Sequence, residues 1–534
     1  MMAYNLRNRN SLNTRGTYLG SSGSDTESYD SDPDFGPPSR ARRPRRSLRR
    51  AAGIRIPGSE GENSGWNTQR KRSGRPPRSS ATREEHRQGL IERHKRRRRS
   101  NFSLVPHVPV TKRSVVSWLI GLGIVKANEV VWYVDKPSGN ILGEGIATRE
   151  GIHCQCCSRL VTVKEFEVHA GRNTKRPYEH IVQAVSQRSL LACQIKAWEH
   201  KDEQERRKFN NIQPAPKAVD KSDDACMICA DGGDLICCEN CPSTFHAKCI
   251  FMESIPQGEW LCFYCVCKYC GCGIANGMLK KCGQCEKRYH SNCGGENLDL
   301  MNNAGHLFCG KSCKQIHEKF QRLLGVRNDL RDGLSWTLIQ RRDQPLNGSS
   351  ADDNYTRIEC NSKIAVAWQV MNECFLSTID RHTKANMVQS IVYNRGSNFT
   401  RINYGGFYTA ILEKGDEIIC AASIRVHGKL LAEMPFIGTR GRYRRQGMAS
   451  VLEKCIESTL CSMDIEKLVI PSMNDLTSMW MDKYFFARVE DESLKQALSV
   501  YNMVMFPAQV VKLHKTLAML PDLNQGPPET TEEL

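Results

Sequence analysis

Residues 226–265 read CMICADGGDLICCENCPSTFHAKCIFMESIPQGEWLCFYC, and this stretch decides the fold of the middle of the chain. It holds four pairs of metal-ligand residue types in the order Cys-Cys, Cys-Cys, His-Cys and Cys-Cys, each pair separated by two residues. Residues 267–313 repeat that order, with three residues inside the last pair. Each array supplies eight ligands, enough for two tetrahedral zinc ions with no open position, so we expect four structural zinc ions.

The order of the ligands predicts an interleaved cross-brace, in which the first and third pairs share one ion and the second and fourth share the other. In the first array the expected ligands are Cys226, Cys229, Cys238, Cys241, His246, Cys249, Cys262 and Cys265. In the second array they are Cys267, Cys270, Cys282, Cys285, His290, Cys293, Cys309 and Cys313. The alternative, a disulfide framework, needs an oxidising compartment and a secretory leader. The first residues are charged and polar where a leader is apolar, which disfavours that alternative.

The residues between the ligands of the first array resemble those of a PHD finger. The match comprises Asp231-Gly232-Gly233-Asp234-Leu235, the pair Phe245-His246 and Trp260 two residues before a ligand. The second array resembles a degenerate, extended PHD finger without that Trp. Cys237 and Cys272 lie beside ligands as spare thiols.

PHD fingers often bind a histone tail as an added β-strand, and the receiving strand is expected at residues 234–237. Nearby acidic residues are expected to attract Lys and Arg of the tail: Asp223, Asp224, Asp231 and Asp234. The residues expected to contact the histone tail are Asp231, Asp234 and Leu235. Residues 242–244 lack the Trp of trimethyl-lysine readers, so the resemblance implies a tail with unmodified lysine. The alternative is a finger that only packs against its neighbours.

The first 105 residues form a basic tail. They hold 24 Lys and Arg against 10 Asp and Glu, and so carry most of the net charge of +18 of the 534-residue chain. Few aliphatic residues occur there, so we expect disorder. His94–Arg99 fits a nuclear localisation signal, and residues 71–78 resemble a minor-groove AT-hook that would bind DNA. Together with reduced thiols and zinc, the tail indicates the nucleus or the cytosol, and the localisation signal favours the nucleus. The longest apolar stretch, Val115–Val125, is too short to span a membrane.

Residues 106–205 are expected to form a small α+β domain. A helical apolar face begins at Val115, and Val130–Val134 reads as a strand. The pattern around residues 151–171 resembles the corepressor-binding, distantly SAND-like domain that precedes PHD fingers in plant nuclear proteins. Three residues in it are candidate ligands of a further zinc ion: Cys154, Cys157 and His169. No clear fourth ligand accompanies them, so buried cysteines and a hydrogen-bonded histidine are the favoured interpretation.

The segment 345–517 has the order of a phosphate-binding α/β domain. A hairpin at residues 407–426 precedes a strand at 430–438, whose Pro435 predicts a bulge or an open edge. A basic loop then enters an amphipathic helix, so that backbone N–H groups and the helix dipole favour a pyrophosphate. Arg444-x-x-Gly447-x-Ala449 is similar to the loop of GNAT acetyltransferases. The resemblance implies acetyl-CoA bound by the loop and by the bulge, through Phe436, Ile437, Arg444, Arg445, Gln446, Gly447, Met448 and Ala449.

Acetyl transfer to a lysine amine requires a base and a polarised thioester carbonyl. By resemblance to GNAT histone acetyltransferases, Glu433 is the expected base, the alternative being a partly exposed strand residue. Tyr484 is the expected acid for the leaving thiolate, and an equally open alternative places it in the core. GNAT domains usually have an aromatic-Gly-Phe turn here, but Phe485 replaces the Gly. We therefore expect a different turn geometry.

The last residues, 521–534, form an acidic tail. Within it, residues 522–527 read DLNQGP and resemble the plant EAR repression motif, which binds TOPLESS-type corepressors. The alternative is an ordinary solvated tail.

Taken as a whole, residues 106 to about 520 resemble the plant PHD-finger acyl-CoA N-acyltransferases of the increased-DNA-methylation type. The expected fold is multidomain: a disordered basic tail (1–105), the SAND-like domain (106–205), tandem cross-brace PHD fingers (226–265 and 267–315), an α/β GNAT domain (345–517) and the repression-motif tail (521–534). The resemblance implies a nuclear chromatin regulator that binds histone tails and acetylates histone lysines. Whether it is an enzyme stays open, because a non-catalytic reader and corepressor adaptor is the alternative. A ubiquitin ligase with a RING cross-brace is disfavoured.

Overall fold

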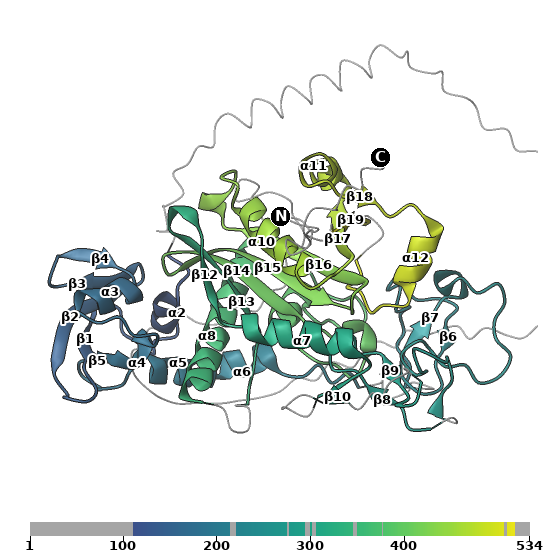
Figure 1. The fold of residues 1–534 in the computed structure, drawn as a ribbon, viewed down its shortest axis with the longest axis horizontal. Coiled ribbons are helices and arrows are strands. Elements are labelled where there is room, and N and C mark those ends of the chain that lie inside the picture. Colours follow the sequence, from purple (N-terminus) through teal and green to yellow (C-terminus); the bar gives the residue numbers. More distant parts are fainter. Residues whose placement is uncertain are drawn as a thin grey trace, which may run out of the picture. The chain divides into compact units, whose positions relative to one another are not determined.

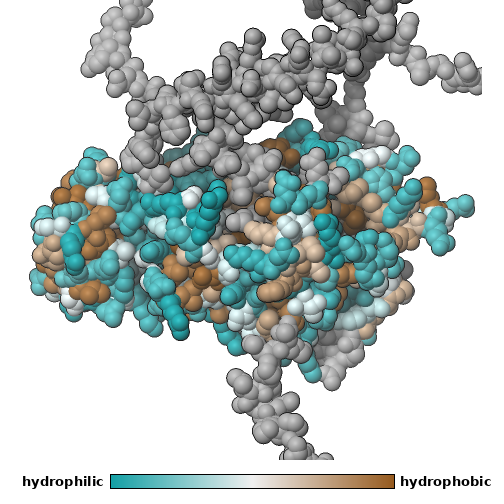
Figure 2. All heavy atoms as spheres, turned by 90° about the horizontal axis from the view of Figure 1, so that it is seen from above, coloured by the Kyte–Doolittle hydropathy of each residue, from teal (hydrophilic) through white to brown (hydrophobic). Residues whose placement is uncertain are grey.

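The computed structural model describes residues 111–213, 221–274, 277–293, 300–301, 306–344, 350–375, 378–506 and 510–517. The basic tail with its localisation signal and AT-hook, and the DLNQGP motif, lie outside these residues. In the described residues, no helix combines the length and apolarity that crossing a bilayer requires. On the face drawn in Figure 2, hydrophilic side chains alternate with smaller groups of hydrophobic ones.

A five-stranded antiparallel sheet forms the first domain. In spatial order its strands are β4 (Arg159–Val161), β3 (Gly151–Cys154), β2 (Ile141–Thr148), β1 (Glu129–Val134) and β5 (Ile181–Gln183). The accompanying helices are α2 (Val115–Gly121), α3 (Val163–His169), α4 (Pro177–His180), α5 (Leu190–Trp198) and α6 (Lys201–Arg207). The predicted helix at Val115 and strand at Val130 are confirmed. Helix α3 begins at a capping box, in which Thr162 and Glu165 satisfy each other's backbone N–H groups.

The two zinc arrays contain little regular structure, as expected where ligands replace an apolar core. Their short strands are β6 (Ile236–Cys237), β7 (Thr244–Phe245), β8 (Lys280–Lys281), β9 (Arg288–Tyr289), β10 (Leu300–Met301) and β11 (Leu307–Phe308). A 3-10 turn, η1, spans Ala247–Ile250. Helix α7 (Lys311–Leu323) follows the second array and buries its apolar residues Ile316 and Phe320.

An eight-stranded sheet forms the largest core (Figure 1). Its spatial order is β12 (Arg327–Asp329), β13 (Leu334–Ile339), β14 (Tyr408–Lys414), β15 (Glu417–Val426), β16 (Leu431–Thr439), β17 (Lys467–Met473), β19 (Val510–Thr516) and β18 (Ala487–Arg488). The pair β16–β17 is parallel and the other pairs are antiparallel. The predicted hairpin and the strands after it are confirmed.

The sheet starts upstream of residue 345, where the α/β domain was expected to begin. Strand β13 pairs with β14 along its whole length, from Leu334↔Lys414 to Ile339↔Thr409. All six residues of β13 are buried, so its polar Ser335 and Thr337 do not mark a solvent-facing side. The polar loop near residue 345 therefore lies inside this domain, and no change of domain occurs there.

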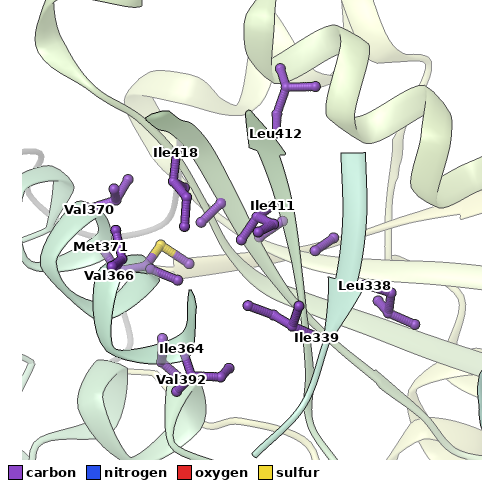
Figure 3. Packing of buried hydrophobic residues seen from close by; sticks show 14 of the residues in the cluster. Leu338, Ile339, Ile364, Val366, Val370, Met371, Val392, Ile411, Leu412 and Ile418 are labelled. Carbon is purple, nitrogen blue, oxygen red and sulfur yellow. The ribbon is translucent and has the colours of Figure 1, made fainter. Parts of the chain in front are cut away.

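Helices cover the sheet on both faces. Helix α8 (Ala351–Cys374) packs against β13 to β16, and helix α10 (Met448–Cys461) packs against β14 to β16. Every residue of β15 is buried, so both faces of that strand are covered. Figure 3 shows Val366, Val370 and Met371 of α8 directed toward Ile411 and Ile418 of the sheet. Further helices are α9 (Met387–Val392), α11 (Asn474–Tyr484), α12 (Glu492–Ser499) and the 3-10 turns η3 (Arg331–Gly333), η4 (Thr400–Ile402) and η5 (Gly441–Tyr443).

Candidate functional site

The first array folds as the predicted cross-brace. Its ligand atoms gather into two groups, each with every donor within 4.8 Å of the others: Cys226, Cys229, His246 and Cys249, and then Cys238, Cys241, Cys262 and Cys265. The first and third pairs thus meet, as do the second and fourth. Three thiols with one imidazole, and four thiols, are the donor sets of structural zinc sites. The residues present therefore fit two zinc ions.

The second array repeats the arrangement. Its groups are Cys267, Cys270, His290 and Cys293, and then Cys282, Cys285, Cys309 and Cys313. The longer last pair is explained by α7, because Cys309 precedes that helix and Cys313 lies in its first turn. Cys237 and Cys272 belong to none of the four groups, and the described cysteines form no disulfide bonds, so no disulfide framework is found among the described residues. With four ligands and no open position, these sites are scaffolds.

The expected histone-binding strand is present as β6, which pairs with β7 through Ile236↔Phe245 and Cys237↔Thr244. In the described part of the chain this sheet has two strands, so the other edge of β6 carries no strand. Asp231 and Asp234 are exposed beside it and Leu235 is half-buried. This edge fits the added-strand expectation.

Asp223 does not belong to the exposed acidic set, contrary to the prediction. It is 4% exposed and accepts hydrogen bonds from the Arg401 guanidinium at 2.7 and 3.0 Å. Arg401 also contacts Asp380 at 2.5 Å. A carboxylate held in this buried network is not available to a histone tail, so Asp223 links the first array to the segment before β14.

Strand β16 parts from its neighbour at the predicted place. It pairs with β17 only from Leu431↔Lys467 to Glu433↔Val469, although both strands continue further. On the other side, the register with β15 shifts between Ser423 and Arg425, opposite the Met434-Pro435 step. Pro435 has no N–H to donate to a ladder, which accounts for the bulge. The sheet is therefore open beyond Glu433.

The predicted cofactor loop lines a cavity of about 100 Å³ at the end of β16. Its walls are Thr439, Tyr443, Arg444, Arg445, Gly447, Met448, Ala449, Ser450, Lys483 and Tyr484. Gly447 is the N-cap of α10 and has a φ of 81°, a conformation that glycine adopts without a steric penalty. The first turn of α10 therefore presents backbone N–H donors at this cavity. Five of the eight predicted cofactor residues line it.

The other three predicted cofactor residues lie outside this cavity. Gln446 is exposed in the loop, and its side chain donates to the Arg442 carbonyl at 2.8 Å. Phe436 and Ile437 are fully buried in β16, where the Phe436 ring packs edge-on against Phe375 with centroids 5.1 Å apart. Since both side chains are buried in the core, only the backbone groups of Phe436 and Ile437 are left to bind a cofactor.

Tyr484 reaches the same cavity from the end of α11. Its ring stacks at a tilt on Trp480, with centroids 4.5 Å apart, and the side chain is 5% exposed. Burial raises the pKa of the Tyr484 hydroxyl, so the group stays protonated at neutral pH. It is at once a core residue and a proton-bearing wall of the cavity, so the two expectations are not exclusive.

Glu433, the expected base, is buried and ionised, which excludes the alternative of a partly exposed strand residue. It contacts the Arg425 Nε at 2.7 Å, the His427 Nε2 at 2.9 Å and the Val504 backbone N–H at 2.9 Å. Burial by itself would raise its pKa, but the Arg425 charge and the His427 hydrogen bond outweigh burial and lower the pKa to about 2. Burial also lowers the pKa of His427, which favours the neutral imidazole. Glu433 is thus a constant negative charge and a weak base.

A second cavity of about 300 Å³ opens on Glu433. It is lined by Ile228, Cys229, Asp231, Glu433, Val469, Pro471, Met503, Val504, Met505, Phe506, Val510 and Lys512. The first three belong to the first zinc array and the rest to the eight-stranded sheet and its connections. Lys512 was not predicted: burial lowers the pKa of its amine, and it reaches the cavity because β19 pairs with β17. No local pattern marks it, because Pro471↔Lys512 is a contact between distant segments.

The chain is similar to known proteins over most of these parts. It matches the models of the PHD-finger at residues 226–265, the Tify domain binding domain at 145–197 and the C-terminal domain of Increased DNA methylation 1 at 375–516. It is 37% identical over 414 residues to Increased DNA methylation 1 of Arabidopsis thaliana, which covers 76% of this chain and 34% of the relative. The chain thus spans about a third of the length of that relative.

Two further similarities cover single parts. The human Autoimmune regulator is 43% identical over 53 residues, 10% of each chain. The ribosomal-protein-S18-alanine N-acetyltransferase from Escherichia coli is 10% identical, covers 36% of this chain and 99% of its own, and superposes with a TM-score of 0.22, too low to carry an argument. The chain is therefore a homologue of Arabidopsis Increased DNA methylation 1 that contains a PHD finger and the C-terminal domain described for that protein.

Proposed function

We propose that this protein is a nuclear chromatin regulator that binds a histone tail through its PHD finger and transfers an acetyl group from acetyl-CoA to a lysine side chain. Homology to Increased DNA methylation 1 supports a role in chromatin and DNA methylation. The PHD finger supports recognition of a histone tail with unmodified lysine, because an exposed β6 edge lies beside Asp231 and Asp234.

One observation carries the catalytic part of the proposal: two cavities lie at the two ends of the part of β16 that does not pair with β17. Thr439 lines the cavity with the Gly447 loop, and Glu433 lines the larger one. An acyl donor held by the loop and an acceptor amine held at Glu433 would approach each other along the open strand. Placing two reactants in this way supplies a large part of the rate enhancement of group transfer.

The loop end of this arrangement suits the phosphates of acetyl-CoA. Backbone N–H groups of the first turn of α10 point toward the cavity, and the helix dipole adds positive potential. Arg444 and Arg445 line the same cavity and carry two cationic groups. Arg444 is positioned by donating from Nε to the Thr439 carbonyl at 3.0 Å.

The Glu433 end suits a lysine ammonium. Its ionised carboxylate attracts the cation, and the apolar walls around it, such as Val469 and Met503, fit the aliphatic stem. Acetyl transfer forms the N–C bond and breaks the C–S bond. The amine loses a proton, which passes to Glu433 or through water, and the thiolate gains one from Tyr484. Because the pKa of Glu433 is about 2, its main contribution is to hold and orient the ammonium.

The position of the PHD finger supports coupling of binding and transfer. Ile228, Cys229 and Asp231 belong to the finger and line the cavity of Glu433. A histone tail paired with β6 would therefore lie close to the cavity of Glu433. A lysine of that tail would have a high effective concentration in the cavity.

A non-catalytic adaptor is the second candidate. The low pKa of Glu433 favours it, since a carboxylate engaged by Arg425, His427 and Val504 is a stabilising ion pair as it stands. Adaptor functions also fit the Tify domain binding match at residues 145–197. A TOPLESS-type corepressor at residues 522–527 and DNA binding by the basic tail stay predictions.

The first experiment is calorimetric titration of acetyl-CoA into the full chain. We expect saturable binding in the micromolar range, and at least tenfold weaker binding by Gly447→Glu, since a side chain is strained at a φ of 81° and its charge repels phosphate. Gly441→Ala is the matched control, because a Cβ there meets nothing within 4 Å and should leave binding unchanged.

Acetylation of histone peptides by the same preparations separates the two candidates. Transfer that is lost in both Gly447→Glu and Glu433→Gln supports the enzyme. Acetyl-CoA binding without transfer, or histone-tail binding without acetyl-CoA binding, leaves the adaptor.

A further inference from the structure

We propose that the five-stranded domain holds a fifth structural zinc ion, bound by Cys154, Cys156, Cys157 and His169. The four donor atoms lie within 4.8 Å of one another. The donor set, three thiols and one imidazole, is the same as in one group of each zinc array. The fourth ligand, which the sequence-based prediction lacked, is Cys156.

The fold brings the ligands together from three local elements. Cys154 ends β3, and Cys156 and Cys157 lie in the turn that leads to β4. That turn is tight, because Cys154 already pairs with Arg159 across the hairpin, and Ser158 has a φ of 53°. His169 is the last residue of α3, which packs against β3 and β4.

The histidine-to-thiol distances match those in the PHD finger. From the His169 Nδ1 to the thiols of Cys156 and Cys157 they are 3.4 and 3.5 Å. In the PHD finger, the corresponding distances from the His246 Nδ1 are 3.2 Å to Cys229 and 3.8 Å to Cys249. Zn–S bonds of about 2.3 Å and Zn–N bonds of about 2.0 Å place the donors of a tetrahedral site roughly 3.5–3.8 Å apart.

The geometry excludes the simplest alternatives. The Sγ atoms of Cys154 and Cys156 are 3.1 Å apart, well beyond the disulfide bond length of about 2.05 Å. Cys154 is buried, but Cys156 is exposed and Cys157 and His169 are half-buried, so the group is not a set of core cysteines. The cluster faces solvent, where an ion can enter.

The zinc ion would stabilise the β4 edge of the five-stranded sheet, which is short and exposed. Strand β4 is the edge of the sheet, three residues long, and its Arg159 and Leu160 are exposed. Coordination joins this hairpin to the end of α3, inside the region that matches the Tify domain binding domain. Metal binding here would therefore keep the partner-binding domain in one conformation, and its loss would loosen the edge without opening the apolar core around Phe166.

Zinc content per full-length chain tests the proposal. We expect five zinc ions in the wild-type protein by elemental analysis and four in Cys156→Ser and in His169→Asn. Cys237→Ser and His153→Asn are matched controls, since they remove an exposed thiol and an exposed imidazole outside the five groups, and both should retain five. Four ions in the wild type, unchanged in Cys156→Ser, would overturn the proposal.

A measurement on the unmodified chain removes any dependence on variant folding. Cys156 and Cys237 are both exposed thiols. Under a brief treatment with N-ethylmaleimide, mass spectrometry should find Cys156 modified at least tenfold more slowly than Cys237, because zinc masks its thiolate. Preincubation with a chelator should make the two rates similar. Equal rates before chelation would show that Cys156 carries no metal.

Discussion

At the scale of single residues, Phe485 shows how the fold keeps a turn that its sequence disfavours. It is the C-cap of α11 with a φ of 59°, a left-handed conformation that glycine adopts without a steric penalty and phenylalanine does not. Phe485 adopts this strained conformation, and the next ring, Phe486, packs edge-on against Trp480 with centroids 5.5 Å apart. The strain is tolerated because that packing holds the turn.

Phe485→Gly should stabilise the protein by about 1 kcal/mol, since it removes a left-handed penalty of roughly 1–2 kcal/mol and adds a smaller entropic cost. Thermal unfolding measures the effect. Phe485→Ala is the control: it also removes the ring, which is 77% exposed, but keeps the strain, and should give no gain. A gain in Phe485→Ala equal to that of Phe485→Gly would assign the effect to the exposed ring.

Glu433 gives a pH prediction at the same scale. With a pKa of about 2, it is ionised throughout the range from pH 5 to 9. The acetyl-transfer rate should therefore rise with pH as the substrate amine loses its proton, with no inflection from Glu433 between pH 5 and 8. The measurement is kcat/KM against pH. An inflection in this range that disappears in Glu433→Gln would show that substrate binding breaks the Arg425 pair and raises the pKa.

At the scale of elements, the turn between β14 and β15 buries a carboxylate at a cost. Burial raises the pKa of Asp416 to about 6, only partly offset by the Lys112 ammonium at 4.0 Å. A raised folded-state pKa means that the neutral acid is favoured in the folded state. Stability is therefore lost as the pH rises from about 4 to about 6, and it stays at the lower level above that range.

Asp416→Asn removes the ionisable group and should therefore stabilise the protein at pH 7.5. The gain in the free energy of unfolding should be on the order of 3 kcal/mol, which corresponds to the rise in the pKa of Asp416. The check is the difference in melting temperature between variant and wild type at pH 5 and pH 7.5, which should grow with pH. Asp464→Asn alters an exposed aspartate and should show no such growth. A difference independent of pH would contradict the assigned cause.

At the scale of the whole molecule, a buried ion network joins the PHD finger to the larger sheet. Arg401 lies between Asp223, from the finger's leading segment, and Asp380, and all three are less than 9% exposed. Removing one member of such a network leaves a buried charge without its partner.

Asp223→Ala should therefore lower the free energy of unfolding by about 3–5 kcal/mol and increase hydrogen exchange on both sides of the contact. Asp224→Ala, at the exposed neighbour, should change stability by less than about 0.5 kcal/mol. If both variants behave alike, the finger and the sheet are not coupled through Arg401.

The four zinc-ligand groups and the hairpin with the strand after it were predictable from the sequence, because each depends on residue types within a short segment. Ligand type and spacing restrict a cross-brace to few arrangements, and Pro435 dictates a bulge wherever its strand pairs. The loop that carries Arg444 and Gly447 before α10 was predictable for the same reason, because a short segment carries the whole pattern; its role in binding a cofactor stays a proposal.

Only the tertiary structure decided which distant surfaces meet. It placed Asp223 against Arg401, surrounded Glu433 with Arg425 and His427, and carried Lys512 into the same cavity. It also joined β12 and β13 to the sheet. The physical reason is that burial and charge pairing depend on the approach of segments far apart along the chain. The amino-acid sequence by itself therefore determined which chemistry is present, whereas the packing decided where that chemistry is buried, how acidic it is and what it faces.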